Sequence, residues 1–281
     1  MFARVAIAGF GLIGGSIGYA AKHRWPSIHV TAIDEAAIVD AARRAGAADA
    51  GAQDLSAAHD ADLVVLAAPV RQNIRLAEQL PGLLSRSALV TDVGSTKAQI
   101  VSACARMPTL AFIGGHPMAG GARGGFSAAR ADLFDGHPWI LTPGAHHSEH
   151  LDTLKSFVAG LGGIPHVMSA ELHDRLVAAI SHLPQLTASA LMHVVGGLAG
   201  DTGVQLAGAG LVDTTRLAGS PPHIWRDIAA TNEEPLREAL DALIRTLTDL
   251  RNGLGNGDKL DAVFTSAVRW RDALLHARGD S

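Results

Sequence analysis

The stretch Arg4-Val-Ala-Ile-Ala-Gly9-Phe-Gly11-Leu-Ile-Gly14-Gly15-Ser16 joins an apolar run to closely spaced glycines and the start of a helical pattern. The glycines follow the spacing Gly9-x-Gly11-x-x-Gly14. In a strand–turn–helix unit, the first glycine lets the chain turn and the second lets a pyrophosphate approach the backbone. The third lets the helix pack closely on the strand. Because the first N–H groups of such a helix face the phosphates, Leu12 and Ile13 join the three glycines as expected dinucleotide contacts.

A second apolar run, residues 28–33, ends in Asp34 at the distance from the glycines that dinucleotide sites show, about 20 residues. An acidic side chain there suits the ribose hydroxyls of NAD, whereas an arginine accommodates the 2′-phosphate of NADP. Glu35 follows Asp34 and no arginine stands beside it, so we expect NAD as the cofactor. The alternative is a glycine turn in some other α/β protein, with Asp34 as a solvated strand end.

The composition is that of a globular protein with two domains of ordinary size. The chain has 281 residues, of which 48% are hydrophobic. A net charge of −4, without blocks of like charge, argues against a nucleic-acid surface. The single cysteine, Cys104, excludes an internal disulfide and a thiolate zinc cluster, and we expect it to be a small buried hydrophobic residue. Met1 leads directly into the first strand and no apolar run reaches the ~20 residues of a membrane span, so we expect a cytoplasmic protein.

Apolar runs and helical patterns alternate over residues 1–168, which predicts a Rossmann-type doubly wound parallel sheet of the α/β class. The expected strands are 4–8, 28–33, 62–67, 88–91, 110–113, 139–141 and 165–168. The expected helices include 13–24, 36–45, one ending near residue 80, and 149–161. Such sheets bind ligands outside the carboxyl ends of their strands. The residues there, which we expect along one crevice, are 9–14, Asp34, Ala68, Pro69, Ser95 and His116.

From Ser169 onward the pattern is helical, so we expect an NAD-binding domain at 1–168 and an all-helical substrate and dimerisation domain at 169–281. A long helix over 171–195 carries Pro184 as an expected kink. Helices follow at 204–218 and from Pro222, for which Ser220 is a plausible cap. In the tail, leucines recur at 236, 240, 243, 247 and 250. Such a stripe is core or a seam between subunits, and the many apolar faces of this short domain favour a homodimer.

His116 and Ser95 are the candidates for proton chemistry. His116 stands between Gly115 and Pro117 after a strand, and an imidazole with its usual pKa near ~6.5 accepts a proton at neutral pH. A dehydrogenase acting on an alcohol needs such a base, because a hydride leaves carbon while a proton leaves oxygen. The alternative is a loop histidine with a structural hydrogen bond. Ser95 either joins base, substrate and nicotinamide ribose or caps the next helix, in whose first turn we expect a solvated Lys97.

The helical domain offers two polar clusters. His182 and Gln185 lie three residues apart on one helix face, which indicates either a polar pocket or a satisfied interior histidine. Arg216 presents a planar fork of donors to a carboxylate, and Asp213 either orients it or forms an internal ion pair with it.

Three other histidines, His146, His147 and His150, lie in a polar loop without an acid or cysteine at binding spacing. We therefore expect no metal site there.

Five segments together resemble the prephenate/arogenate dehydrogenases of tyrosine biosynthesis. They are Gly9-Phe-Gly-Leu-Ile-Gly-Gly-Ser16, Asp92-Val-Gly-Ser-Thr-Lys97, Gly115-His-Pro-Met-Ala-Gly120, Ser181-His-Leu-Pro-Gln185, and Thr215-Arg-Leu-Ala-Gly-Ser220 with Trp225-Arg-Asp227. The resemblance runs from residue 1 to about 250, in order. The first motif is shared with many dehydrogenases, whereas the third and fourth together are specific.

The resemblance implies an NAD(P) domain, a helical dimerisation domain, and an active site between them. It implies oxidative decarboxylation of prephenate to 4-hydroxyphenylpyruvate, or of arogenate to tyrosine. By this resemblance His116 is the catalytic histidine on the ring hydroxyl, and Ser95 assists it beside the nicotinamide. The residues implied for the substrate are His182 in its pocket, Arg216 on a carboxylate, and Asp213 and Trp225 nearby.

One segment departs from the family pattern. After Gly120 many members carry a polar or acidic residue, where this chain has Gly121-Ala-Arg123-Gly-Gly125. The region faces the substrate side chain in the family, and Arg123 either reaches a carboxylate or points to water. We expect prephenate, with arogenate as the alternative.

Two rival functions remain open at this point. Another two-domain NAD enzyme, such as a β-hydroxyacid dehydrogenase or an imine reductase, would rely on a lysine in the helical domain. No helix offers one beside the polar cluster. A catalytically inactive NAD-binding sensor would have no need of the histidines and Arg216 in one crevice.

Overall fold

The computed structural model describes residues 2–84, 88–121, 124–144, 150–255 and 257–278. The chain divides into two compact units, Met1–Glu233 and Glu234–Ser281. The first unit contains the sheet and the helices as far as α9 (Pro222–Thr231), and the second contains most of α10 (Glu233–Asn252) and all of α11 (Gly257–Arg278). The boundary expected at 168/169 lies inside the first unit, where the sheet ends and the helices begin, and it stays a prediction.

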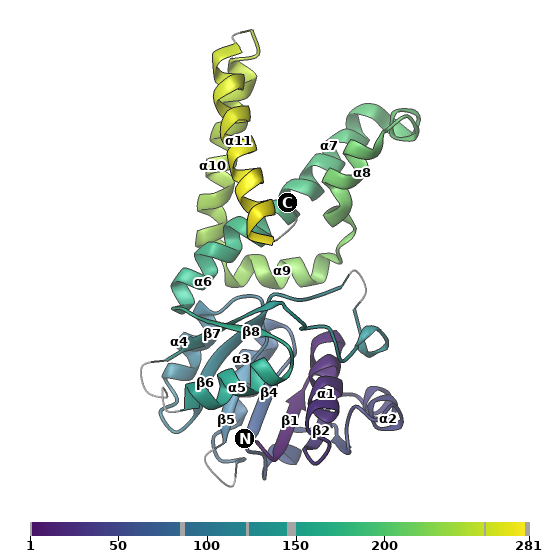
Figure 1. Ribbon diagram of the computed structural model, residues 1–281, viewed down its shortest axis with the longest axis vertical. Helices are drawn as coiled ribbons and strands as arrows, with labels where there is room; N and C mark the ends of the chain where they lie inside the picture. The colour runs from purple at the N-terminus through teal and green to yellow at the C-terminus, as the bar shows by residue number, and fades with distance from the viewer. Residues whose placement is uncertain (1, 85–87, 122–123, 145–149, 256, 279–281) are drawn as a thin grey trace. The chain divides into compact units, whose positions relative to one another are not determined.

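The first unit is built on an eight-stranded sheet with the order β3-β2-β1-β4-β5-β6-β7-β8 (Figure 1). The strands are β1 (Arg4–Ala8), β2 (His29–Ile33), β3 (Ala50–Ala52), β4 (Leu63–Leu66), β5 (Leu89–Asp92), β6 (Ala111–Pro117), β7 (Pro138–Pro143) and β8 (Ile164–Val167). The chain moves outward from β1 to β3 and then returns, so that β4 pairs with the other side of β1. This reversal opens the crevice in which doubly wound sheets bind their ligands, and the expected Rossmann-type fold is confirmed.

The sheet is not parallel throughout. Strand β7 pairs antiparallel with β6, while β8 pairs parallel with β7. A parallel neighbour needs a crossover, usually a helix. In the described part of residues 118–137 the structure has only the short turn η2 (Phe126–Ala128) and no such helix. Strand β7 therefore returns beside β6 in the opposite direction, and helix α5 (Leu151–Gly160) then provides the crossover to β8.

Alternate residues of the strands feed two apolar cores, one on each face of the sheet. Val5 and Ile7 belong to the core that also contains residues of α1 (Leu12–Arg24), α2 (Ala36–Arg44) and α5. Ala6 and Ala8 belong to the second core, with residues of α3 (Val70–Gln79) and α4 (Ala98–Ala105). This alternation is what a strand covered on both faces requires. Cys104 is part of the second core, as expected, and burial raises its pKa to about 12.

The helices after the sheet differ from expectation around Pro184. The expected single helix is α6 (Ala170–Val177), a π-helical turn η4 (Ala178–His182) and α7 (Leu183–Gln205). The irregular turn precedes Pro184, which lies in the first turn of α7, where its missing N–H does not break the helix. Then follow α8 (Ala209–Thr215), the short turn η5 (Arg216–Gly219) and α9. Ser220 does not cap α9, whose N-cap is Pro221.

The second unit carries the leucine stripe on α10. Leu236 is buried, but Leu247 is 54% exposed, and on α11 Phe264 and Val268 are 64% and 59% exposed. The interpretation of the leucine stripe as core therefore fails at Leu247. None of the described helices is long and apolar enough to cross a membrane.

The glycine turn between β1 and α1 is fixed by close backbone packing. Gly9 has a φ of +95°, a conformation that side chains disfavour, and its N–H donates to the carbonyl of Ile33 over 2.9 Å. A Cβ on Gly14 would lie 2.0 Å from the carbonyl oxygen of Gly9. Gly11 is different, because a Cβ there would meet nothing within 4 Å. The first and third glycines are thus structural, whereas the space at the second is open to a ligand.

This difference predicts opposite effects for two alanine substitutions. Gly14→Ala forces α1 away from the turn and should lower the free energy of unfolding by about 1–3 kcal/mol, as overpacking does. The matched control, Gly11→Ala, should change it by less than about 1 kcal/mol while raising the Kd for NAD. Denaturant titration and NAD titration measure the two quantities. Equal stability of Gly14→Ala and the parent protein would contradict this reading of the turn.

Candidate active site

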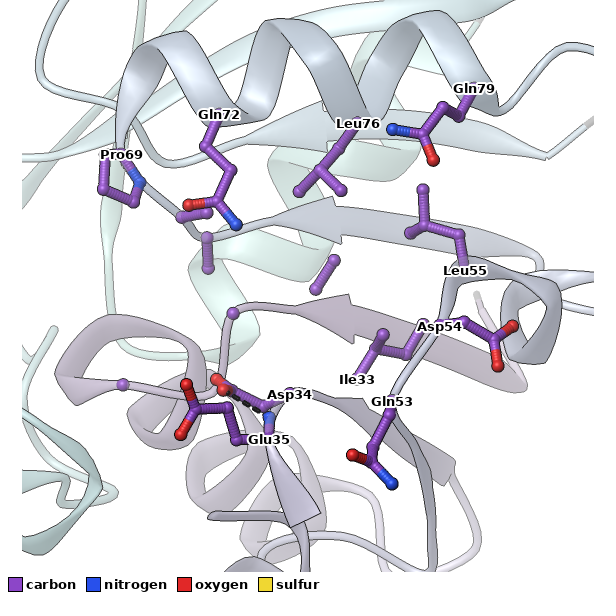
Figure 2. A pocket seen from close by; sticks show the side chains of 15 residues that line it. Ile33, Asp34, Glu35, Gln53, Asp54, Leu55, Pro69, Gln72, Leu76 and Gln79 are labelled. Carbon is purple, nitrogen blue, oxygen red and sulfur yellow. Dashed lines mark hydrogen bonds between the residues drawn. The ribbon is translucent and has the colours of Figure 1, made fainter. Parts of the chain in front are cut away.

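A cavity of about 640 Å³ lies at the carboxyl ends of β1, β2 and β4 (Figure 2). Its lining is Ala8, Gly9, Gly11, Ile33, Asp34, Glu35, Gln53, Asp54, Leu55, Ala67, Ala68, Pro69, Gln72, Leu76 and Gln79. The Asp34 carboxylate holds the glycine turn, since it accepts the N–H of Phe10 over 2.5 Å and that of Glu35 over 2.7 Å. Each oxygen keeps further lone pairs for ribose hydroxyls.

These residues fit a dinucleotide. The open space at Gly11 is a cradle that any side chain would fill, and α1 begins there without a side-chain cap on its N–H groups. Leu12 and Ile13 are half-buried in that first turn, and with Gly14 they lie outside the described lining. The charged lining residues described are all acidic, which disfavours the additional phosphate of NADP.

The turn Ala68-Pro69 is held by a residue that the sequence analysis missed. The side chain of Asn73 is fully buried, accepts the N–H of Ala68 over 3.0 Å and donates to the carbonyl of Leu66 over 3.1 Å. Asn73 thereby shapes the wall of the cavity. Gln53, Gln72 and Gln79, which also line it, were missed as well, because a glutamine in a helical pattern or loop carries no distinctive signal.

A second cavity of about 620 Å³ brings together most of the remaining predicted residues. Its lining is Ser95, His116, Pro117, Met118, Ala119, Gly120, Gly121, Ser181, His182, Arg216, Leu217, Gly219, Ser220, Pro221, Ile224, Trp225 and Ile228. The single crevice expected from the strand ends is therefore two lined cavities in the described chain. Asp213 does not line the second cavity: it is exposed on α8, and among the described residues no ion pair joins it to Arg216.

His116 lies near the end of β6 and lines this cavity. Its ring is hydrogen-bonded to a residue that does not line the cavity. Its Nδ1 lies 2.8 Å from Nε2 of His173, and Nδ1 of His173 lies 2.7 Å from Oδ1 of Asp174. His173 and Asp174 are 0% and 2% exposed on α6. Sequence reasoning missed both. The available signal was their place on the buried stripe of α6, which also contains Ala170 and Val177.

Asp174 also settles how the helix after Ser95 begins. Its carboxylate accepts the N–H of Lys97 over 2.7 Å and of Ala98 over 2.8 Å, so it caps α4 from outside that helix. Ser95 is therefore not the cap, and its half-buried side chain lines the cavity. Lys97 is not solvated as expected: it is fully buried and paired with Asp92, and burial lowers its pKa while Asp92 opposes that shift.

The hydrogen bonds around His182 indicate which of its two ring nitrogens carries the proton. Nδ2 of Asn232 lies 2.8 Å from the carbonyl oxygen of Asp174, which only accepts, and 3.2 Å from Nδ1 of His182. The amide thus donates to Nδ1, and the neutral ring carries its proton on Nε2. Trp225 packs edge-on against this ring, with 5.9 Å between centroids.

Arg216 is carried by the turn η5, which Gln185 holds. Nε2 of Gln185 donates to the carbonyl of Leu217 over 2.7 Å, and the Ser220 hydroxyl donates to Oε1 of Gln185 over 3.0 Å. Gln185 is thus a structural residue beneath the cavity. Arg216 is the one arginine or lysine among the described residues that line it.

The rings of His116 and His182 are both held neutral. Burial lowers the pKa of His116 well below its usual 6.5, and His173, Lys97 and His182 add to the shift. Burial also lowers the pKa of His182 to about 4, although Asp174 opposes the change. Neutral His116 is the form that accepts a proton.

Three of the residues weighed in the sequence analysis, Arg123, His146 and His147, lie outside the described residues. Within the described ranges, no three His, Cys, Asp or Glu side chains are placed to hold a metal ion.

Two sequence models match the chain. One, for the prephenate dehydrogenase nucleotide-binding domain, matches residues 17–166, and the other, for the prephenate dehydrogenase dimerization domain, matches residues 169–265. Cyclohexadienyl dehydrogenase of Zymomonas mobilis is 34% identical, over 98% of this chain and 97% of its own length. Prephenate dehydrogenase of Bacillus subtilis is 34% identical, over 96% of this chain and 76% of its own length.

Solved structures agree with these matches. Prephenate dehydrogenase from A. aeolicus, crystallised with hydroxyphenyl propionate and NAD+, gives a TM-score of 0.90 at 28% identity, over 98% of this chain and 99% of its own. Synechocystis arogenate dehydrogenase gives 0.84 at 30% identity, over 96% and 99%. On the glycine turn, the two cavities and these matches, the chain belongs to the prephenate dehydrogenase family.

Proposed function

We propose that this NAD-dependent dehydrogenase converts prephenate to 4-hydroxyphenylpyruvate, with His116 as the base. The observation that carries the proposal is the shared cavity of His116 and Arg216, which come from the sheet and from the turn η5. A neutral imidazole and a guanidinium on one cavity suit a substrate with a hydroxyl at one place and a carboxylate at another.

Each of the residues His116, Arg216 and Ser95 has a separate role in the proposed reaction. His116 takes the proton of the ring hydroxyl as the carbon that bears it is oxidised. NAD+, when bound, supplies the hydride acceptor. Arg216 holds a substrate carboxylate by charge-assisted hydrogen bonds. Ser95 assists His116 through its hydroxyl beside the nicotinamide. Loss of CO2 then makes the ring aromatic, so the reaction does not run back.

For the cofactor we propose Gly9, Gly11, Gly14, Leu12 and Ile13 at the pyrophosphate, Asp34 at the ribose, and Ala68, Pro69 and Ser95 as further contacts. Support comes from the cradle at Gly11 and from the free carboxylate lone pairs of Asp34.

On the substrate side, His182 donates from Nε2 and Trp225 forms an apolar wall. Asp213 stays a proposed substrate residue on the resemblance alone, since it lies outside the described lining.

The lining favours prephenate over arogenate. Prephenate carries a pyruvyl side chain, whereas arogenate carries an ammonium group that needs an acidic partner. No Asp or Glu stands among the described lining residues of the second cavity. Arogenate remains the second candidate, because the Synechocystis arogenate dehydrogenase is 30% identical to this chain.

We also propose a homodimer, built through residues 169–281. The nucleotide-binding model matches residues 17–166 and the dimerization model matches residues 169–265. These separate matches support a domain boundary at about residue 168. Large apolar side chains on the helices are exposed, among them Leu198, Leu206, Val212 and Trp270 at 85%, 82%, 64% and 63%. A second copy of the chain would cover such surface.

The decisive test follows NADH production with prephenate and with arogenate, each with NAD and with NADP. Prephenate with NAD should give the highest kcat/KM. His116→Asn should lower kcat by about 10²- to 10⁴-fold, the usual contribution of a general base, while the Kd for NAD stays within about twofold. Turnover by His116→Asn at the parent rate would remove His116 as the base.

The pH dependence of kcat/KM reports the base in the free enzyme. Because the pKa of His116 is lowered, the imidazole stays neutral when the pH falls through 6.5, and it is protonated only in more acid solution. We expect kcat/KM to be flat from pH 8 to below 6.5 and to decline only in more acid buffers. A decline centred at or above pH 6.5 would contradict the assignment.

Arg216→Ala tests the carboxylate site. Hydrogen bonds to charged groups are worth about 1.5–3 kcal/mol, so the KM for prephenate should rise about 10- to 100-fold with little change in kcat. Arg44→Ala, on the exposed surface of α2, is the matched control and should leave both constants unchanged. An unaltered KM in Arg216→Ala would mean that the carboxylate binds elsewhere.

A further inference from the structure

Behind the second cavity, a chain of hydrogen bonds connects a buried carboxylate to the proposed base. It runs from Asp174 through both ring nitrogens of His173 to Nδ1 of His116, over 2.7 Å and 2.8 Å. Neither His173 nor Asp174 lines the cavity, and neither carries a motif that the sequence analysis used. Their side chains are nevertheless almost wholly buried.

The direction of the first hydrogen bond follows from the surroundings of Asp174. Its Oδ1 accepts the N–H of Lys97 and its Oδ2 accepts the N–H of Ala98, so both oxygens already face donors. An ionised carboxylate only accepts, and in that form all three neighbours are satisfied. Nδ1 of His173 must therefore carry a proton and donate it to Oδ1.

The direction of the second hydrogen bond follows from the first. His173 is 0% exposed, and a second proton would make its ring a cation without contact with water. With one proton, on Nδ1, its Nε2 is a lone pair. Nδ1 of His116 must then be the donor in their shared hydrogen bond. The remaining ring nitrogen of His116, Nε2, is left with its lone pair.

We propose that Asp174 and His173 are positioning residues that hold His116 in the tautomer with a lone pair on Nε2. This inference rests on the proposed role of His116 as the base. In this tautomer the hydroxyl proton moves to Nε2, and the positive charge that forms on the ring is shared with Nε2 of His173 through the Nδ1–H bond. The arrangement follows the logic of a carboxylate that orients a catalytic histidine, with a second imidazole inserted between them.

Two substitutions of His173 separate this role from simple packing. In His173→Asn the amide occupies the place of Nδ1 and has no atom at the place of Nε2, so the acceptor for His116 is lost. In His173→Gln the amide reaches the place of Nε2 and its oxygen accepts the Nδ1–H of His116. We expect kcat to fall about 10- to 100-fold in His173→Asn, a part of the effect of losing the base, and to recover largely in His173→Gln. The KM for prephenate should stay within about threefold in both.

The matched control is His166→Asn, since His166 is exposed on β8 and should leave kcat unchanged. If His173→Asn and His173→Gln lose activity equally, or if both keep the parent kcat, the positioning role is overturned.

A second measurement does not depend on activity or on any variant of His173 being folded. Long-range ¹H–¹⁵N spectra of the parent protein with labelled histidines distinguish the two tautomers, and His116→Asn identifies the His116 signals by their loss. We expect His116 to be protonated on Nδ1 and unprotonated on Nε2. The reverse pattern in the parent protein overturns the inference.

The two proposals fail in different ways. Full turnover by His116→Asn, with the expected tautomer in the parent spectra, would remove the base and leave the hydrogen-bond assignment intact. An inactive His116→Asn, together with a freely exchanging His116 ring in the parent spectra, would keep the base and remove the role of His173.

Discussion

The carboxylate of Asp174 is the contact on which the site depends. It accepts the backbone N–H groups that begin α4, directly after Ser95, and it also holds the ring of His173 behind His116. One buried side chain of α6 thus holds both the start of the helix after Ser95 and the ring behind His116, and Ser95 and His116 line the second cavity. Three donors surround the carboxylate, which compensates for the loss of water around it. Breaking this junction would disturb Ser95 and His116 together.

Most of the fold could be predicted because its signals are local. The glycine turn, the apolar strands and the helices between them follow from spacing within a few residues, and the structure confirms them. The features that were not predicted depend on contacts between residues far apart in the sequence. Strand β3 is Ala-Gly-Ala and has no apolar pattern of its own, so only its pairing with β2 reveals it. The reversed direction of β7 follows from the absence of a helix in the described part of its connection to β6. A kink was expected at Pro184, whereas the irregular segment is the π-helical turn before it, which no local pattern indicated.

The candidate site could be predicted in part, for the same reason. His116, Ser95, His182, Arg216 and Trp225 were identified from motifs, and the structure brings them to one cavity. Lys97 was placed in solvent because a lysine in the first turn of a helix is usually solvated. Its burial depends on Asp92, and the exclusion of Ser95 as a cap depends on Asp174, 77 residues from Lys97. Polar residues on a buried stripe, such as His173 and Asp174, are the one local clue that sequence reasoning left unused.

The amide of Asn232 has a consequence for how a molecule enters the second cavity. It touches the backbone of Asp174 and the ring of His182, so that histidine offers a proton, while His116 offers an electron pair. The two rings therefore make the cavity asymmetric, because one ring is a hydrogen-bond donor and the other is an acceptor. A symmetric ligand could bind in either of two orientations with the same free energy. An elongated substrate with unlike ends has only one orientation in which both rings form their hydrogen bonds.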